Sequence, residues 1–146
     1  MSVTITVFIR KGAMLSPAAW QKAITQQGFD VTLDPDFDPV TFSGFLPARL
    51  AQRDAGFEYL FGPVDPEDVD AGPGATAAAG LDECISFVTH SDIVELVSAA
   101  LSAAALAAAV EGLLWDHEAG EGHRGRAALE WARALEREVA EQRSPA

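Results

Sequence analysis

Cysteine is nearly absent from this sequence, which holds only Cys84. One cysteine cannot form an intramolecular disulfide, so the chain is not one of the small disulfide-stapled secreted scaffolds. Basic side chains are also scarce, with ten lysines and arginines against 22 aspartates and glutamates. The formal net charge of -12 argues against nucleic acid and anionic membranes as partners, because their phosphates would be repelled.

Long apolar runs are missing as well. The longest uncharged, apolar-rich stretch is Leu96 to Val110, which is 15 residues long and mostly alanine. A membrane-spanning helix needs about 20 strongly apolar residues, so none is expected here. The first residues show no basic segment followed by an apolar one, so we expect no signal peptide. Together with the lone cysteine, these features predict a cytoplasmic protein.

The acidic side chains are concentrated in the middle of the chain. Residues 1–29 carry a formal charge of +3, residues 30–83 carry -10 and residues 84–146 carry -5. A segment this acidic favours a basic protein partner or a cation. We assign a partner-binding role to the carboxylates of this segment that stand in predicted loops and on one strand: Asp34, Asp36, Asp38, Glu58, Asp65, Glu67, Asp68 and Asp70.

Alternating apolar residues and helix-capping signals predict one α+β domain over residues 1–146. Strands are expected at 3–9, 29–33, 40–50, 56–61, 82–89 and 113–116, and helices at 17–27, 93–111 and 126–142. Alternating strands favour a two-layer sandwich, in which a mixed, largely antiparallel sheet of about six strands carries two helices on one face and a C-terminal helix. Residues 62–81 are rich in glycine, proline and acid and predict a flexible surface loop.

Several motifs begin like catalytic or metal-binding sites and do not complete them. Residues 120–125 match G-x-G-x-x-G, yet no strand follows to complete a dinucleotide-binding unit, so we expect a flexible connector. The acids of 34–38 and 65–70 have the early spacing of an EF-hand loop but lack its glycine and its last acid. His117 and Glu118 begin H-E-x-x-H, but Glu121 replaces the second histidine. We predict no catalytic residue, cofactor or metal.

The second face of the sheet needs a cover. Phe8, Phe45 and Leu60 alternate away from the main core face among polar neighbours. An apolar group of this kind is normally buried by another element or a partner. The last helix, a second copy of the chain in a homodimer, or another protein could cover it.

Three stretches carry a resemblance: Ser43 to Pro47, Gly56 to Tyr59, and Gly112 to Asp116 after an alanine-rich helix. They resemble an uncharacterised family of small bacterial α+β proteins of immunity-protein-like character, over about residues 3–118. Immunity proteins neutralise a toxin by binding it. The resemblance therefore implies inhibition without catalysis, and it supplies no catalytic residue.

Two functions stay open on the sequence. The first is a non-catalytic acidic binding protein, an immunity-type inhibitor that neutralises a basic partner such as a toxin by presenting carboxylates in place of phosphates. The alternative is a small enzyme or ligand-binding domain with a pocket between the sheet and the long helix. Its candidate residues are Arg49, Glu58, Tyr59, His90 and Asp116.

Overall fold

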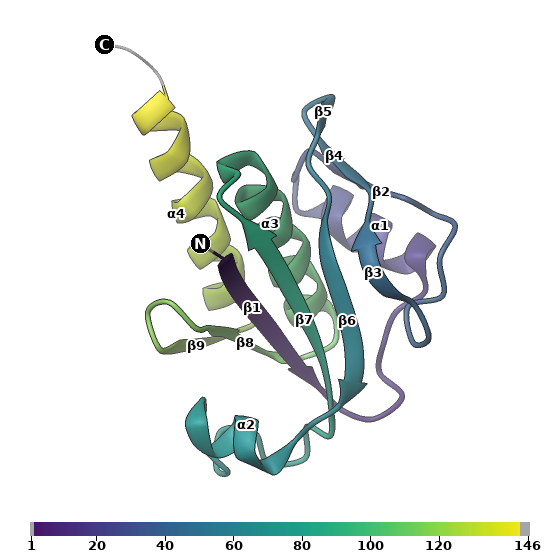
Figure 1. Cartoon of the computed structure of the whole chain (residues 1–146), viewed down its shortest axis with the longest axis vertical. Helices are drawn as coiled ribbons and strands as arrows, with labels where there is room; N and C mark the ends of the chain where they lie inside the picture. Colours follow the sequence, from purple (N-terminus) through teal and green to yellow (C-terminus); the bar gives the residue numbers. More distant parts are fainter. Residues whose placement is uncertain (1, 144–146) are drawn as a thin grey trace.

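The computed structural model of the chain describes residues 2–143, which form nine strands and four helices (Figure 1). The strands are β1 (Ser2–Ile9), β2 (Val31–Leu33), β3 (Ser43–Leu46), β4 (Ala48–Leu50), β5 (Arg53–Asp54), β6 (Phe57–Pro63), β7 (Glu83–His90), β8 (Leu113–Asp116) and β9 (Glu121–Arg124). The helices are α1 (Pro17–Gln26), α2 (Pro66–Ala71), α3 (Ile93–Ala109) and α4 (Arg126–Arg143).

Six strands form the main sheet in the order β3-β6-β7-β1-β8-β9, and each neighbouring pair is antiparallel. The central strand β1 pairs with β7 along its whole length, from Ser2 opposite His90 to Ile9 opposite Glu83. Its alternating apolar side chains face the main core, as the period of two predicts. The predicted α+β fold with a six-stranded sheet and a C-terminal helix is confirmed, and the sheet is antiparallel throughout.

Helix α3 organises the layer of helices on one face of this sheet. Twelve of its 17 residues are buried, because their alanine and serine side chains let neighbouring elements approach from several sides. The helix contacts four central strands of the sheet, and α1 and α4 pack beside it. Figure 1 shows β1, β6 and β7 in front of α3, with α1 behind the sheet as well.

The aromatic cluster around Trp20 joins α1 to this layer. The Trp20 side chain is fully buried, and its indole Nε1 donates a hydrogen bond to the Ser102 carbonyl of α3 at 3.0 Å. Its ring lies 6.0 Å from the Tyr59 ring and 5.9 Å from the Phe87 ring, measured between centroids. The Tyr59 hydroxyl in turn donates to the Pro39 carbonyl at 2.6 Å, which ties the loop between β2 and β3 to the helical side of the sheet.

The single strand predicted over residues 40–50 is wrong, because the chain passes from one sheet to another at Pro47. Strand β3 before it pairs with β6 in the main sheet, whereas β4 after it joins β2 and β5 in a separate three-stranded sheet. Proline has no N–H to continue a ladder. Its carbonyl accepts a hydrogen bond from the Asp34 N–H at 3.1 Å. The small sheet lies beside α1 and α3.

Residues 62–81, predicted to be a loop, include the end of β6 and the short helix α2. Asp65 caps α2 by accepting a hydrogen bond from the Glu67 N–H at 2.9 Å. The segment packs on the second face of the sheet, and Arg124 donates to the Ala77 carbonyl to hold it there. The apolar residues buried in this smaller core are Phe8, Val69, Ala78, Leu81 and Leu113.

The last helix, α4, leaves the second face open. Its buried residues Ala128, Leu129, Ala132 and Val139 belong to the main core with α3. The helix therefore lies on the same face as α1 and α3. Of the covers considered for the second face, α4 is excluded, and the segment around α2 covers only the end that holds Phe8.

Replacing Trp20 with alanine tests the aromatic cluster. Loss of the buried indole leaves a cavity and removes its hydrogen bond to the Ser102 carbonyl, so we expect the free energy of unfolding to fall by about 3–5 kcal/mol. Urea denaturation followed by circular dichroism measures this change. The exposed Lys22 on the same helix gives the control, since Lys22→Ala should change it by less than about 0.5 kcal/mol. Equal stability of the two variants would contradict the central place of Trp20.

Candidate functional site

Part of the second sheet face is covered by no element of residues 2–143. This part lies over β3, β6, β7 and the start of β1, and we call it the open face (Figure 1). The strand register sets its side chains in two rows. One row runs from Phe45 through Glu58 to Val88, and the next runs from Leu60 to Ser86. Phe45 is 56% exposed and Leu60 is 45% exposed, so the middle of this face is apolar and accessible.

The Phe45 ring packs against the backbone of Gly56 on the open face. It lies over Gly56, where any added side chain would collide with the ring and with the Leu46 carbonyl. Gly56 immediately precedes β6, and an aromatic ring laid across a glycine covers backbone that would otherwise be exposed. The ring is therefore held in place while more than half of its residue's surface stays accessible.

A histidine–glutamate pair stands at one end of the open face. His90 Nε2 lies 3.2 Å from Glu58 Oε1, and their side chains are 59% and 48% exposed. Burial raises the pKa of the nearby Glu95 carboxyl, the negative charge of Asp92 raises it further, and His90 lowers it. The Glu58 carboxylate therefore marks this end of the open face, in contact with His90.

Hydroxyl groups connect the strands beneath the open face. Thr6 Oγ1 lies 3.3 Å from Ser86 Oγ and 2.9 Å from His117 Nε2, so β1, β7 and the turn after β8 are linked through one buried threonine. Short polar contacts of this kind between neighbouring strands stabilise a sheet. We assign them the role of joining these strands.

The carboxylates of α2 border the open face at its other end. The segment that contains α2 packs on Phe8, on the same side of the sheet. Asp68 is close enough to Cys84 on β7 to raise the pKa of the thiol, although burial of the sulfur is the larger cause. Asp65, Glu67, Asp68 and Asp70 are all exposed.

The other three predicted acids lie elsewhere. Asp34, Asp36 and Asp38 occupy the loop between β2 and β3, which packs on the helical side of the sheet. The Asp34 Oδ1 accepts a hydrogen bond from the Asp36 N–H at 2.9 Å, and Asp38 Oδ1 accepts one from the Val40 N–H at 3.0 Å. In Figure 1 this loop lies at the right edge of the molecule and α2 at the bottom, so the acidic segment is divided into two separate clusters. Glu58, on β6, belongs to neither.

The residues of the pocket alternative do not converge. Glu58 and His90 meet, but Tyr59 points to the opposite face, where its hydroxyl is bound to Pro39 and burial, followed by the charge of Asp38, raises its pKa. Arg49 lies in the small sheet and donates to the Gln52 carbonyl at 2.6 Å. Asp116 bonds to α4. The shallow cavities that Arg49 lines, about 280 and 270 Å³, include none of the other four residues.

Residues 120–125 form a hairpin strand rather than a flexible connector. Most of the motif lies in β9, which pairs with β8, and Gly122 lies against the Trp115 ring where a side chain would crowd it. A phosphate-binding loop needs its backbone N–H groups free at a helix N-terminus, and a strand does not provide this. The sequence missed β9 because its four residues, Glu121–Arg124, show no apolar alternation.

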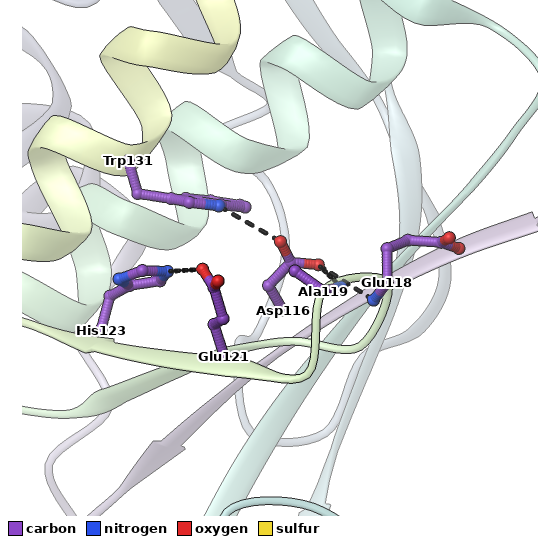
Figure 2. A network of polar contacts seen from close by, with 6 residues as sticks. All are labelled: Asp116, Glu118, Ala119, Glu121, His123 and Trp131. Carbon is purple, nitrogen blue, oxygen red and sulfur yellow. Dashed lines mark hydrogen bonds and ion pairs between the residues drawn. The ribbon is translucent and has the colours of Figure 1, made fainter.

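Figure 2 shows what the polar side chains around this hairpin do. The Trp131 indole of α4 donates to Asp116 Oδ2 at 3.3 Å, while Asp116 Oδ1 accepts from the Glu118 N–H at 3.0 Å. His123 stacks on Trp131 with ring centroids 5.8 Å apart, and its Nε2 lies 3.6 Å from Glu121 Oε2. The network fastens α4 to the β8–β9 hairpin, which is a structural role.

Comparisons with known protein families, with curated proteins and with solved structures found no match. The resemblance to immunity-type proteins therefore stays a prediction. Across residues 2–143 no cluster of three or more histidine, cysteine or acidic side chains is arranged to hold a metal ion. Within the same residues, none of the helices has the length and apolar character needed to cross a membrane.

The network of Figure 2 gives a stability prediction. Asp116→Ala removes the acceptor for the Trp131 indole and for two backbone N–H groups, so we expect the free energy of unfolding to fall by about 1–3 kcal/mol. Thermal and urea denaturation measure it. The neighbouring Glu118→Ala is the control, because that side chain is exposed. A similar loss in both variants would contradict the fastening role of Asp116.

The raised pKa of Cys84 gives a chemical prediction. Because the thiolate is the reactive form, iodoacetamide should alkylate Cys84 more slowly than it alkylates glutathione at the same pH. Asp68→Asn should speed the reaction by roughly twofold, since it removes a nearby negative charge. Asp36→Asn, on the other cluster, should leave the rate unchanged. A Cys84 that reacts as fast as glutathione would show that the thiol is not protected.

Proposed function

We propose that this chain is a non-catalytic acidic binding protein that neutralises a basic partner protein, as an immunity-type inhibitor neutralises a toxin. The observation that carries the proposal is a set of exposed carboxylates without cationic partners. Among the side chains described, those of residues 2–141, no lysine, arginine or histidine lies at salt-bridge distance from any predicted acid except Glu58, which pairs with His90.

Some of these acids form hydrogen bonds to nearby backbone N–H groups, and others do not. Asp34, Asp38 and Asp65 each use one carboxylate oxygen to close a turn or cap a helix. In the described part of the chain, the side chains of Asp36, Glu67, Asp68 and Asp70 make no hydrogen bond, although all four are exposed. These four are therefore available to a partner, and the local structure does not explain their presence.

Uncompensated charge of one sign supports binding to a protein of the opposite sign. Like charges on one surface repel each other, and a basic partner relieves that repulsion when it docks. Complementary fields also steer the encounter and raise association rates by about 10–10³-fold at low salt. We place the protein in the cytoplasm, where a free cysteine such as Cys84 stays reduced.

The pocket alternative has less support, because its candidate residues lie on different faces. A cavity of about 450 Å³ lies between the small sheet, α3 and α4. It includes none of Arg49, Glu58, Tyr59, His90 or Asp116. We therefore base the functional proposal on the charged surface.

The purified basic proteins encoded beside this chain's gene are the partners to test. We expect one of them to form a complex whose association rate falls by about tenfold or more between low and high salt. Stopped-flow fluorescence and calorimetry measure the rate and the affinity. Converting both acidic clusters to amides should weaken the complex at least about tenfold. The amide substitutions are Asp34→Asn, Asp36→Asn, Asp38→Asn, Asp65→Asn, Glu67→Gln, Asp68→Asn and Asp70→Asn.

The control removes charge from other parts of the surface. Glu118→Gln, Glu130→Gln and Glu138→Gln change exposed acids outside both clusters and should reduce the affinity by less than about threefold. If no neighbouring gene product binds, or if the amide variant binds as tightly as the wild-type chain, the proposed function is wrong.

A further inference from the structure

The open face has the distribution of apolar and charged side chains that is typical of a binding surface. Its middle holds Phe45 and Leu60, which are accessible and apolar, and Phe45 is already seated by Gly56. Its two ends are acidic, with Glu58 at one and α2 at the other. Protein interfaces commonly have an apolar centre that loses its water and a polar rim that stays wet.

Only one of the two acidic clusters borders this face. The segment that carries the α2 cluster packs on Phe8 and Leu113, which places it on the same side of the sheet. The cluster of Asp34, Asp36 and Asp38 lies on the helical side, tied to Tyr59 through Pro39. A partner that covers Leu60 can contact α2, whereas the other cluster stays behind the edge strand β3.

We infer that the open face is the docking site, and that its occupant is a protein with an apolar centre and basic side chains around it. This inference rests on the proposed function and adds the surface on which it acts. Leu60 and Phe45 supply the contacts that lose water, and the carboxylates of α2 and Glu58 pair with the basic rim of the partner.

A second copy of the chain fits this face less well. Two copies that met through their open faces would bring the acidic rims together, and each copy carries a formal net charge of -12. Like-charged rims at an interface oppose association. Charge complementarity therefore favours a basic protein over self-association.

Two matched sets of variants test the docking site with the purified basic gene neighbour that binds the wild-type chain. The first set compares Glu67→Gln, Asp68→Asn and Asp70→Asn with Asp34→Asn, Asp36→Asn and Asp38→Asn. Both triple variants remove three negative charges, so they alter the overall field equally. The α2 variant should weaken binding by roughly tenfold or more, and the loop variant by less than about threefold.

The second set tests the apolar centre at constant charge. Leu60→Thr suits a strand and should weaken binding by roughly tenfold, mainly through faster dissociation. Phe45→Thr should act in the same direction, and circular dichroism shows whether it still folds without its cover over Gly56. Val40→Thr is the control, because Val40 is 51% exposed but lies in the loop on the helical side. Val40→Thr should bind like the wild-type chain.

The outcomes separate this inference from the proposed function. In one outcome, the loop variant and Val40→Thr lose affinity while the α2 variant and Leu60→Thr do not. The partner then binds on the helical side, so the proposed docking site is wrong although the proposed function stands. If no basic neighbour binds, both fail. If light scattering shows a dimer at micromolar concentration that Leu60→Thr dissociates, the open face joins two copies and the inference is overturned.

Discussion

The close approach that small side chains permit along α3 determines the rest of the architecture. Alanine and serine on nearly every side let the sheet, α1 and α4 pack around one helix. The apolar sides of those elements are then buried on a single face of the sheet. Since α2 and its flanking turns cover only one end of the other face, the strands β3, β6 and β7 keep one side exposed to solvent. The open face is thus a direct result of how the main core is packed.

The carboxylates that give the chain its negative charge differ in position and in role. Several carboxylates act first on their own backbone, as Asp34, Asp38, Asp65 and Asp92 show by closing turns or capping helices. Others have no such role, and these stand on α2 beside accessible apolar residues or in the loop before β3. One acidic stretch of sequence therefore gives two surfaces of different character. Only the α2 cluster lies on the same side of the sheet as Phe45 and Leu60, which is why the two clusters are expected to differ in binding.

Local sequence signals predicted the elements whose periodicity and ends are set by residues close together in the chain. The alternation in β1, the Ser16 cap with Pro17 before α1, and the Asp92 cap of α3 all appear where expected. The features that the sequence did not predict depend on contacts between residues far apart in the chain. Nothing local shows that the chain changes sheets at Pro47, or that β9 is held by pairing with β8. The acids of the candidate site were readable from composition, but their division between two sides of the sheet follows from the tertiary packing of the β2–β3 loop on Tyr59.

The position of β1 at the centre of the main sheet has a consequence for synthesis. This strand leaves the ribosome well before either of its ladder partners, since β7 begins at Glu83 and β8 at Leu113. Until they emerge, an alternating apolar strand has both edges unpaired, which is the state most prone to pair with another chain. Contacts this distant in sequence also slow folding. The strand order therefore requires β1 to stay unpaired until most of the domain has been made.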